Sequence, residues 1–196
     1  MATIHNPNNR ESGAFTILAA LAMVGLIGVA ALAIDIGYGL VVKSELQNVA
    51  DTGSLAANRE LALIYKGTPG SAVPYWGTYT LSSTDKARIE VKVNTFSQQN
   101  KAGGKPISIP SSDMVYGKWN NVAGQITPTS TGVLAIGVTA RRDQTANTPI
   151  STWLGRIFGV QSLSIRANSP PSTPHPAIST FHPLLSPLSL HTAGQL

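Results

Sequence analysis

An unbroken apolar run is the feature that most constrains what this chain can fold into. The run, GAFTILAALAMVGLIGVAALAID, extends from Gly13 to Asp35 and carries no charged side chain before that final acid. As a helix, its uncharged part would be about 33 Å long, against about 30 Å for the hydrocarbon core of a bilayer. A soluble core helix keeps a polar edge, whereas this run offers only the hydroxyl of Thr16. The run therefore predicts a transmembrane helix over residues 13–34.

A cleaved signal peptide is the alternative interpretation of this run. The A-L-A triplet at residues 31–33 has the form of a signal-peptidase site, which would be cut after Ala33. However, the run is longer than the roughly 7–15 residues of a signal-peptide core, and the basic Arg10 before it is offset by Glu11. We therefore favour a retained anchor, with residues 1–12 in the cytoplasm and the bulk of the chain outside. A soluble periplasmic or secreted binding module, released by cleavage, remains the alternative.

Composition excludes several function classes. The chain has no cysteine, so it has no disulfide, thiolate nucleophile or cysteine-ligated zinc. The chain has a net charge of +5, but its cations are scattered singly, apart from the pair Arg141 and Arg142. A nucleic-acid-binding surface would instead have clustered cations. Asp113 and Asp143 are isolated acids that fit caps or ion-pair partners better than catalytic groups. We expect no enzyme, no cofactor, no metal and no nucleic-acid partner. The four histidines lie outside the predicted domain, at His5, His175, His182 and His191.

The helix is predicted to continue beyond the membrane as an extramembrane helix over residues 35–66, because no proline occurs between Asp35 and Pro69. Small or apolar residues on this segment recur at alternating spacings of four and three, which places them on one helix face. We favour packing of this stripe against the chain's own domain. Packing against a second protein, including a second copy of the chain, is the alternative. The stripe consists of Val42, Leu46, Val49, Gly53, Ala56, Glu60 and Leu63, in which Gly53 and Glu60 are the two defects.

Two ordered groups of motifs carry a family resemblance. The apolar run ends in a D-x-G motif at residues 35–37, and L-Q-N-x-A-D follows at residues 46–51. Farther on come DMVYGKW, VTARR and LGRIFG at residues 113–119, 138–142 and 154–159. Over residues 10–168 this order resembles the TadE/TadG-like proteins of tight-adherence, or Flp-type, pilus assembly, and is most similar to the TadG-like group. The motif residues, which we take as docking or structural candidates, are Asp35, Gly37, Leu46, Gln47, Asn48, Ala50, Asp51, Tyr116, Trp119, Thr139, Arg141, Arg142, Arg156 and Phe158.

The resemblance implies a non-enzymatic component of pilus assembly or a related secretion apparatus. Such a protein is held in the bacterial inner membrane by one N-terminal helix, with the remainder in the periplasm. The implied partners are the lipid bilayer, pilin and other pilus-assembly proteins. The chain does not look like a processed pilin, since the position five residues after Gly13 is Leu18 rather than glutamate. It also lacks the D-x-S-x-S metal motif that some longer TadG-like proteins carry.

Residues 67–167 predict an α+β domain with a small sheet and short helices. Residues 88–94, RIEVKVN, alternate like a strand but also fit a helical period, and the family resemblance favours a helix over 85–100. A second helix is predicted from Pro149 to Gly159, capped by Thr148. The aromatic residues Tyr116, Trp119, Trp153 and Phe158 are expected to pack in the core or at an interface. The predicted loops are 66–76 and 103–110, and the predicted strands are Met114–Trp119, Val133–Arg141 and Ser162–Ala167.

The final segment, residues 168–196, differs in character from the domain. It holds 6 of the 13 prolines and no charged side chain, so it cannot form a regular element and is expected to be disordered. Because a TadG-like protein would be expected to continue its sheet here, we hypothesise a frameshifted or truncated terminus. Resequencing the locus tests this hypothesis.

Overall fold

The computed structural model describes residues 8–67 and 77–169. The predictions for the extreme N-terminus, for most of the 66–76 loop, for the four histidines and for the proline-rich tail beyond Ser169 lie outside the described residues. Asn168 and Ser169 are exceptions in the predicted tail, because Asn168 ends strand β8 (Ile165–Asn168) and the Ser169 N–H donates to the Val138 carbonyl.

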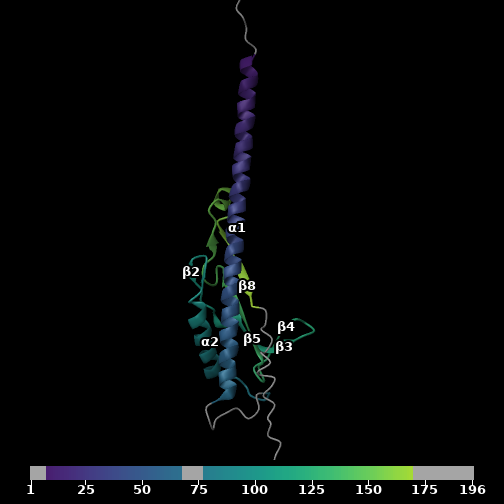
Figure 1. The fold of residues 1–196 in the computed structure, drawn as a ribbon, viewed down its shortest axis with the longest axis vertical. Helices are drawn as coiled ribbons and strands as arrows, with labels where there is room; N and C mark the ends of the chain where they lie inside the picture. The colour runs from purple at the N-terminus through teal and green to yellow at the C-terminus, as the bar shows by residue number, and fades with distance from the viewer. Residues whose placement is uncertain (1–7, 68–76, 170–196) are drawn as a thin grey trace, which may run out of the picture.

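A single helix, α1 (Asn8–Lys66), runs through the molecule for 59 residues, which corresponds to about 88 Å. Its N-terminal end stands free of the domain, and its C-terminal half packs against it (Figure 1). In the described part of the chain, α1 holds the one stretch that is long and apolar enough to cross a membrane. Large side chains from Phe15 to Ile34 are more than half exposed. The predicted long helix, apolar first and domain-packed later, is therefore confirmed.

The rest of the described chain forms a small α+β domain against the C-terminal half of α1, as predicted. Its main sheet is antiparallel, with the strand order β4-β3-β5-β8. The core lies between α1, α2 and this sheet, and its largest fully buried side chains include Leu46, Leu61, Ile89, Ile107, Ile109, Ile136 and Val138. The elements are α2 (Ser83–Ser97), η1 (Ser111–Asp113), β3 (Met114–Asn120), β4 (Gln125–Pro128), β5 (Ala135–Arg142), η2 (Gly155–Phe158) and β8 (Ile165–Asn168), with the short hairpin β1 (Lys101–Ala102) and β2 (Lys105–Pro106) and the short pair β6 (Ile150–Ser151) and β7 (Ser162–Leu163).

Residues 88–94, whose sequence fits both a strand period and a helix period, lie in helix α2. Ile89 and Val93, one turn apart, are fully buried, whereas Val91 between them is 64% exposed. This is the burial pattern of a helix and not of a strand. Ser82 and Asp85 close its N-terminus as a capping box, in which each side chain accepts the other residue's backbone N–H at 3.0–3.1 Å.

The stripe on α1 faces the chain's own domain. Val42, Leu46 and Val49 are fully buried, and Glu60 is buried against Arg88, whose Nη2 lies 2.5 Å from its Oε1. Only Leu63, at the end of the stripe, is 46% exposed. The favoured interpretation is thus correct. The alternative, a partner or second copy docked on the 42–63 stripe, is wrong for this fold because the domain already covers those side chains.

Gly53 lies where α1 packs closely against both α2 and β5. A Cβ added there would lie 3.2 Å from Ser97 Oγ and 3.3 Å from Val138 Cγ1. We expect Gly53→Leu to lower the free energy of unfolding by about 1–3 kcal/mol through overpacking. Gly53→Ala is the matched control and should change stability little, since a helix gain of about 0.8–1 kcal/mol offsets the tight contacts. Urea unfolding in detergent micelles measures both, and equal stability of the two variants would contradict the packing described.

Three local predictions are corrected by the structure. The helix expected from Pro149 to Gly159 is wrong, because Ile150–Ser151 forms strand β6 against β7 and only Gly155–Phe158 coils, as the 3₁₀ helix η2. The strand expected over 162–167 is split into β7 and β8. The 103–110 loop contains the turn of the β1–β2 hairpin and its strand β2, and β4 was not predicted. By contrast, Met114–Trp119 and Val133–Arg141 are confirmed as β3 and β5 within two residues at each end.

Candidate functional site

The residues singled out from the sequence do not converge on one site. Leu46 and Ala50 are fully buried in the core, whereas Gly37, Asn48 and Asp51 are exposed on α1. A Cβ added at Gly37 would meet nothing within 4 Å in the described chain. The motif at residues 46–51 therefore alternates core and surface positions along one helix. It does not gather functional groups.

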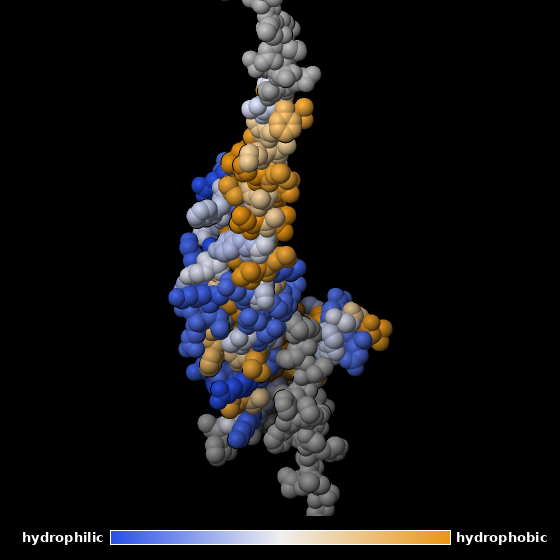
Figure 2. Space-filling view, turned by 45° about the horizontal axis from the view of Figure 1, so that its top comes forward, coloured by the Kyte–Doolittle hydropathy of each residue, from blue (hydrophilic) through white to orange (hydrophobic). Residues whose placement is uncertain are grey.

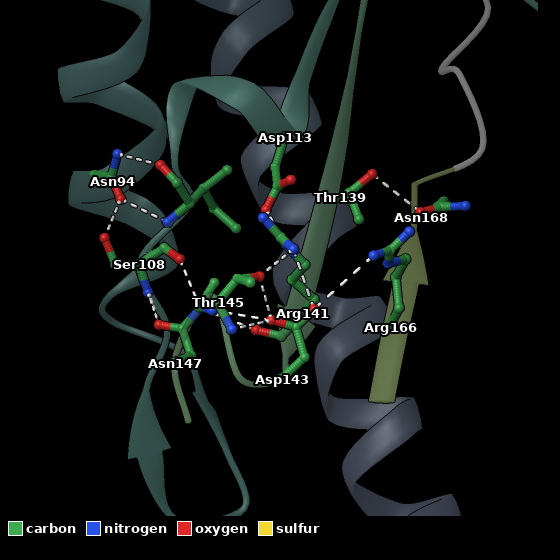
Figure 3. Close-up of polar contacts among 12 residues, drawn as sticks. Asn94, Ser108, Asp113, Thr139, Arg141, Asp143, Thr145, Asn147, Arg166 and Asn168 are labelled. Carbon is green, nitrogen blue, oxygen red and sulfur yellow. Dashed lines mark hydrogen bonds and ion pairs between the residues drawn. The ribbon is translucent and has the colours of Figure 1, made fainter. Parts of the chain in front are cut away.

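Gln47 and Thr139 hold the end of strand β8. Gln47 Nε2 donates to the Asn168 carbonyl at 2.9 Å and to Asp51 Oδ1 at 3.0 Å. Thr139 Oγ1 lies 3.0 Å from Asn168 Oδ1 (Figure 3). These contacts fasten the last described strand to both α1 and β5, so the two motif residues serve the fold.

Tyr116 and Trp119 lie on β3 and are both partly buried. Lys86 Nζ lies 5.5 Å from the centroid of the Tyr116 ring, and burial raises the pKa of the Tyr116 hydroxyl to about 12. Trp119 lies opposite Ile126 of β4. Tyr116 packs against the core of the domain, which agrees with the predicted packing role, whereas Trp119 lies on the β3–β4 hairpin outside that core.

Arg141 is the centre of a polar cluster at the end of β5 (Figure 3). Its Nε donates to Asp113 Oδ2 at 2.6 Å, and its Nη1 donates to Asp143 Oδ2 at 3.1 Å. The Arg141 and Asp113 side chains are only 16% and 11% exposed. Asp113 and Asp143 are therefore ion-pair partners, as predicted, and they tie η1 and the turn after β5 to one guanidinium.

The pKa of Asp143 lies well below its usual value of 3.8, mainly because the Thr145 hydroxyl and backbone N–H donate to its carboxylate, with smaller contributions from the Ala146 N–H and Arg141. A depressed pKa stabilises the fold above the unfolded-state value, and this contribution is lost as the pH falls through the folded-state value. We therefore expect the free energy of unfolding to fall as the pH drops from about 4 towards about 2. Asp143→Asn should be less stable at neutral pH and show a shallower acid dependence in urea titrations. Parallel profiles for the two proteins would contradict this role.

A left-handed turn follows the cluster. Asn147 and Thr148 have φ angles of +60° and +54°, which is unusual for residues other than glycine and strained for the branched Thr148. The Asn147 side chain donates to the carbonyls of Ser108 and Arg141 at 2.8 and 2.9 Å and accepts the Ser108 N–H at 2.9 Å. Figure 3 shows how Ser108 continues this chain of contacts to Asn94 of α2. The network holds the strained turn against the helix layer.

Arg142 is a buried cation that donates hydrogen bonds to the left-handed turn and to the β1–β2 hairpin. It is 4% exposed. Its Nη1 donates to the Ala102 carbonyl at 3.1 Å, and its Nε lies 3.2 and 3.1 Å from the carbonyls of Asn147 and Thr148. One guanidinium thus joins the β1–β2 hairpin to the left-handed turn, and carbonyl dipoles rather than a carboxylate satisfy its charge.

Asp35 binds a segment far away in sequence. Its carboxylate accepts the backbone N–H groups of Trp153, Leu154 and Gly155 at 3.0, 3.1 and 2.6 Å. The Asp35 residue is 7% exposed, although it lies at the end of an exposed apolar helix. The D-x-G acid of α1 therefore fixes the start of the segment from Thr152 to Val160, which we call the aromatic loop.

The aromatic loop carries exposed apolar side chains beside the apolar half of α1. Trp153 and Phe158 are 84% and 64% exposed, and Arg156 is also exposed. Between the loop and the helix lies an open apolar groove of about 540 Å³, with Asp35 at one side. Its lining includes Val24, Gly28, Val29, Leu32, Phe158 and Val160.

Several important residues were not singled out from the sequence. The Asn94 and Asn147 side chains bind backbone groups of Ile109 and Ser108, which lie 15 and 39 residues away, and the Ser108 hydroxyl donates to Asn94. Single-sequence patterns do not report such contacts. The D-x-T sequence at residues 143–145 is a local turn signal that could have indicated the Asp143 turn. In residues 8–67 and 77–169, no three histidine, aspartate or glutamate side chains lie close enough together to hold a metal ion.

Comparison with known families gives two matches that together cover most of the chain. The model of a family described as TadE/G-like Flp pilus assembly matches residues 13–60. A second, described as Tad-like Flp pilus assembly, matches residues 77–169. Neither the search of curated proteins nor that of solved structures finds a match. The two matched segments correspond to α1 and to the domain that packs against it.

Proposed function

Because the chain belongs to the Tad-like Flp pilus-assembly family, we propose that it is a non-enzymatic, membrane-anchored component of that assembly, which acts by docking other proteins. The N-terminal half of α1 crosses the bacterial inner membrane, the residues before it lie in the cytoplasm, and the α+β domain lies in the periplasm. The partners are pilin or other pilus-assembly proteins.

The observation that carries this proposal is the change of surface along one unbroken helix. From Phe15 to Ile34 the large side chains of α1 face outward and are exposed, whereas Val42, Leu46 and Val49 are fully buried in the domain. A helix with apolar side chains all round requires an apolar solvent such as lipid. Since no loop separates the two halves, α1 would hold the domain in a fixed position relative to the membrane.

Docking requires a surface that the chain itself leaves open, and the β3–β4 hairpin offers one. It projects sideways from the domain (Figures 1 and 2), and Val122 at its tip is 99% exposed. Strand β4 is an edge of the sheet, so its outer backbone groups have no strand partner within the described chain. Exposed edges of this kind accept strands from other proteins.

Site-specific crosslinking in cells tests the docking role. The chain has no cysteine, so Val122→Cys creates a single attachment point for a photoreactive maleimide. We expect adducts with pilin or another pilus-assembly protein. Leu55→Cys, on an exposed face of α1 (67% exposed), is the matched control for random collisions. Equal labelling patterns at the two positions, or none at Val122 in cells that assemble pili, would contradict docking through this hairpin.

A soluble module released after Ala33 remains the alternative function, because the A-x-A triplet is present. In the structure Ala31 is 4% exposed and lies inside an unbroken helix. Cleavage after Ala33 would also remove the apolar helix face against which the end of the aromatic loop packs. These observations favour the retained anchor.

A further inference from the structure

The aromatic loop lies beside the part of α1 that is proposed to be inside the membrane. A Cβ built on Gly28 would lie 3.4 Å from Phe158 Cζ, and Asp35 binds the Trp153 N–H. The loop therefore starts level with Asp35 and reaches back along the helix towards its N-terminus. Figure 1 shows this segment beside α1, displaced from the main domain towards the apolar half of the helix.

The depth of the loop follows from helix geometry. Seven residues separate Gly28 from Asp35, which is about 10 Å along a helix. If residues 13–34 fill the hydrocarbon core, Trp153 lies at its boundary and Phe158 lies about 9 Å inside it. This order agrees with membrane proteins in general, where tryptophan is enriched at the interface.

The exposure of the apolar side chains in the aromatic loop also supports a location inside the membrane. Trp153, Ile157 and Phe158 are 84%, 75% and 64% exposed, and Val160 is 47% exposed. Together with the exposed side chains of the neighbouring helix, they form an apolar patch, and exposed apolar patches mark interaction or membrane surfaces. Figure 2 shows the hydrophobic surface running without a break down the free part of the molecule.

The apolar surface of α1 also extends beyond Asp35. Ile36, Leu40 and Val41 are all more than half exposed, and the first basic residue after the run is Lys43. The lipid-facing surface therefore ends past the start of the loop. The two charged groups at this level fit a membrane location, since three N–H donors satisfy Asp35 and the long side chain of the exposed Arg156 can reach the headgroups.

We propose that the aromatic loop is a second membrane-embedded element, inserted beside α1 into the leaflet on the domain's side, with Trp153, Ile157 and Phe158 in contact with lipid acyl chains. This rests on the proposed anchoring by α1. Through the bond to Asp35, the inserted loop fixes both the depth and the rotation of the domain relative to the bilayer.

Fluorescence quenching by lipids tests this insertion. The chain has 3 tryptophans, and Trp76→Phe with Trp119→Phe leaves Trp153 as the sole emitter in the full chain. We expect vesicles of phosphatidylcholine brominated on its acyl chains to quench Trp153 at least twofold relative to unbrominated vesicles. In a tryptophan-free background, Phe158→Trp should be quenched best by bromines placed deeper in the chain than those that best quench Trp153.

Two controls separate failure of the loop from failure of the anchor. A protein with Trp119 as its sole tryptophan should not be quenched, because β3 lies in the domain. Leu21→Trp in the tryptophan-free background should be quenched if α1 spans the bilayer. Quenching at position 21 without quenching of Trp153 would overturn loop insertion alone. No quenching at position 21 would overturn the anchor itself. A Trp153 shielded from both brominated lipid and acrylamide would indicate cover by protein, which also overturns the lipid contact.

Discussion

Replacement of Asp35 by alanine is expected to detach the aromatic loop from α1 while leaving the domain core folded. The carboxylate accepts three backbone N–H groups from residues 153–155. Each hydrogen bond to a charged group contributes about 1.5–3 kcal/mol, but the loop can open and rehydrate its N–H groups, so we expect a local loss of about 3 kcal/mol. That loss should raise hydrogen exchange at the Trp153–Gly155 amides by about 100-fold.

The matched control for this experiment is Asp51→Ala. Asp51 is an acid on the same helix, but it is exposed and accepts only from Gln47 among the bonds described for its side chain. Its replacement should leave exchange at residues 153–155 unchanged. If Asp35→Ala also left these amides protected, the acid of the D-x-G motif would not be what holds the loop. Exchange at the buried amides of β5 reports whether the core survives in each variant.

Replacement of Arg142 by methionine is expected to lower the free energy of unfolding by about 3–5 kcal/mol. Methionine fills similar space but leaves the carbonyls of Ala102, Asn147 and Thr148 without their donor in a buried region. Arg142→Lys should recover only part of the loss, because an ammonium group cannot reach the carbonyls on both sides as the planar guanidinium does. Urea unfolding of the full chain in detergent micelles gives the values.

Arg166→Met is the control for loss of a cation at the same end of the sheet. The Arg166 side chain is 61% exposed and its Nη2 lies 3.9 Å from Asp143 Oδ2, so its replacement should cost less than about 0.5 kcal/mol. Similar losses of unfolding free energy for the Arg142 and Arg166 variants would show that net charge, rather than the buried hydrogen bonds of Arg142, determines the stability.

Strong local periodicity made α1 and the main strands predictable, whereas the prediction of α2 depended on the family resemblance. The apolar run and the stripe from Val42 to Leu63 predicted both halves of α1. The helix predicted over 85–100 is α2, which begins two residues earlier, at Ser83. The two β-rich runs that became β3 and β5 were equally clear. In each case the pattern that determines the element is contained within the element itself.

The structure of residues 148–159 depends on long-range contacts, which the local sequence pattern did not reveal. Thr148, Pro149 and Gly159 resemble helix-boundary signals, yet Arg142 holds the carbonyl of Thr148 and Asp35 binds the N–H groups of residues 153–155. These bonds come from segments 6 and 118 to 120 residues away and replace the expected helix by β6 and η2. The motif residues Asp35, Arg141 and Arg142 were found from the family resemblance, but their roles in joining loops required the structure.

The fate of the N-terminal helix is the most direct test of the anchored assembly component. The measurement is N-terminal sequencing of the protein recovered from alkali-washed inner membranes and from the periplasmic fraction. We expect the protein in the washed membranes, with its N-terminus ahead of Gly13. Recovery in the soluble fraction as a chain that begins at Ile34 would contradict the anchor and establish the released module in its place.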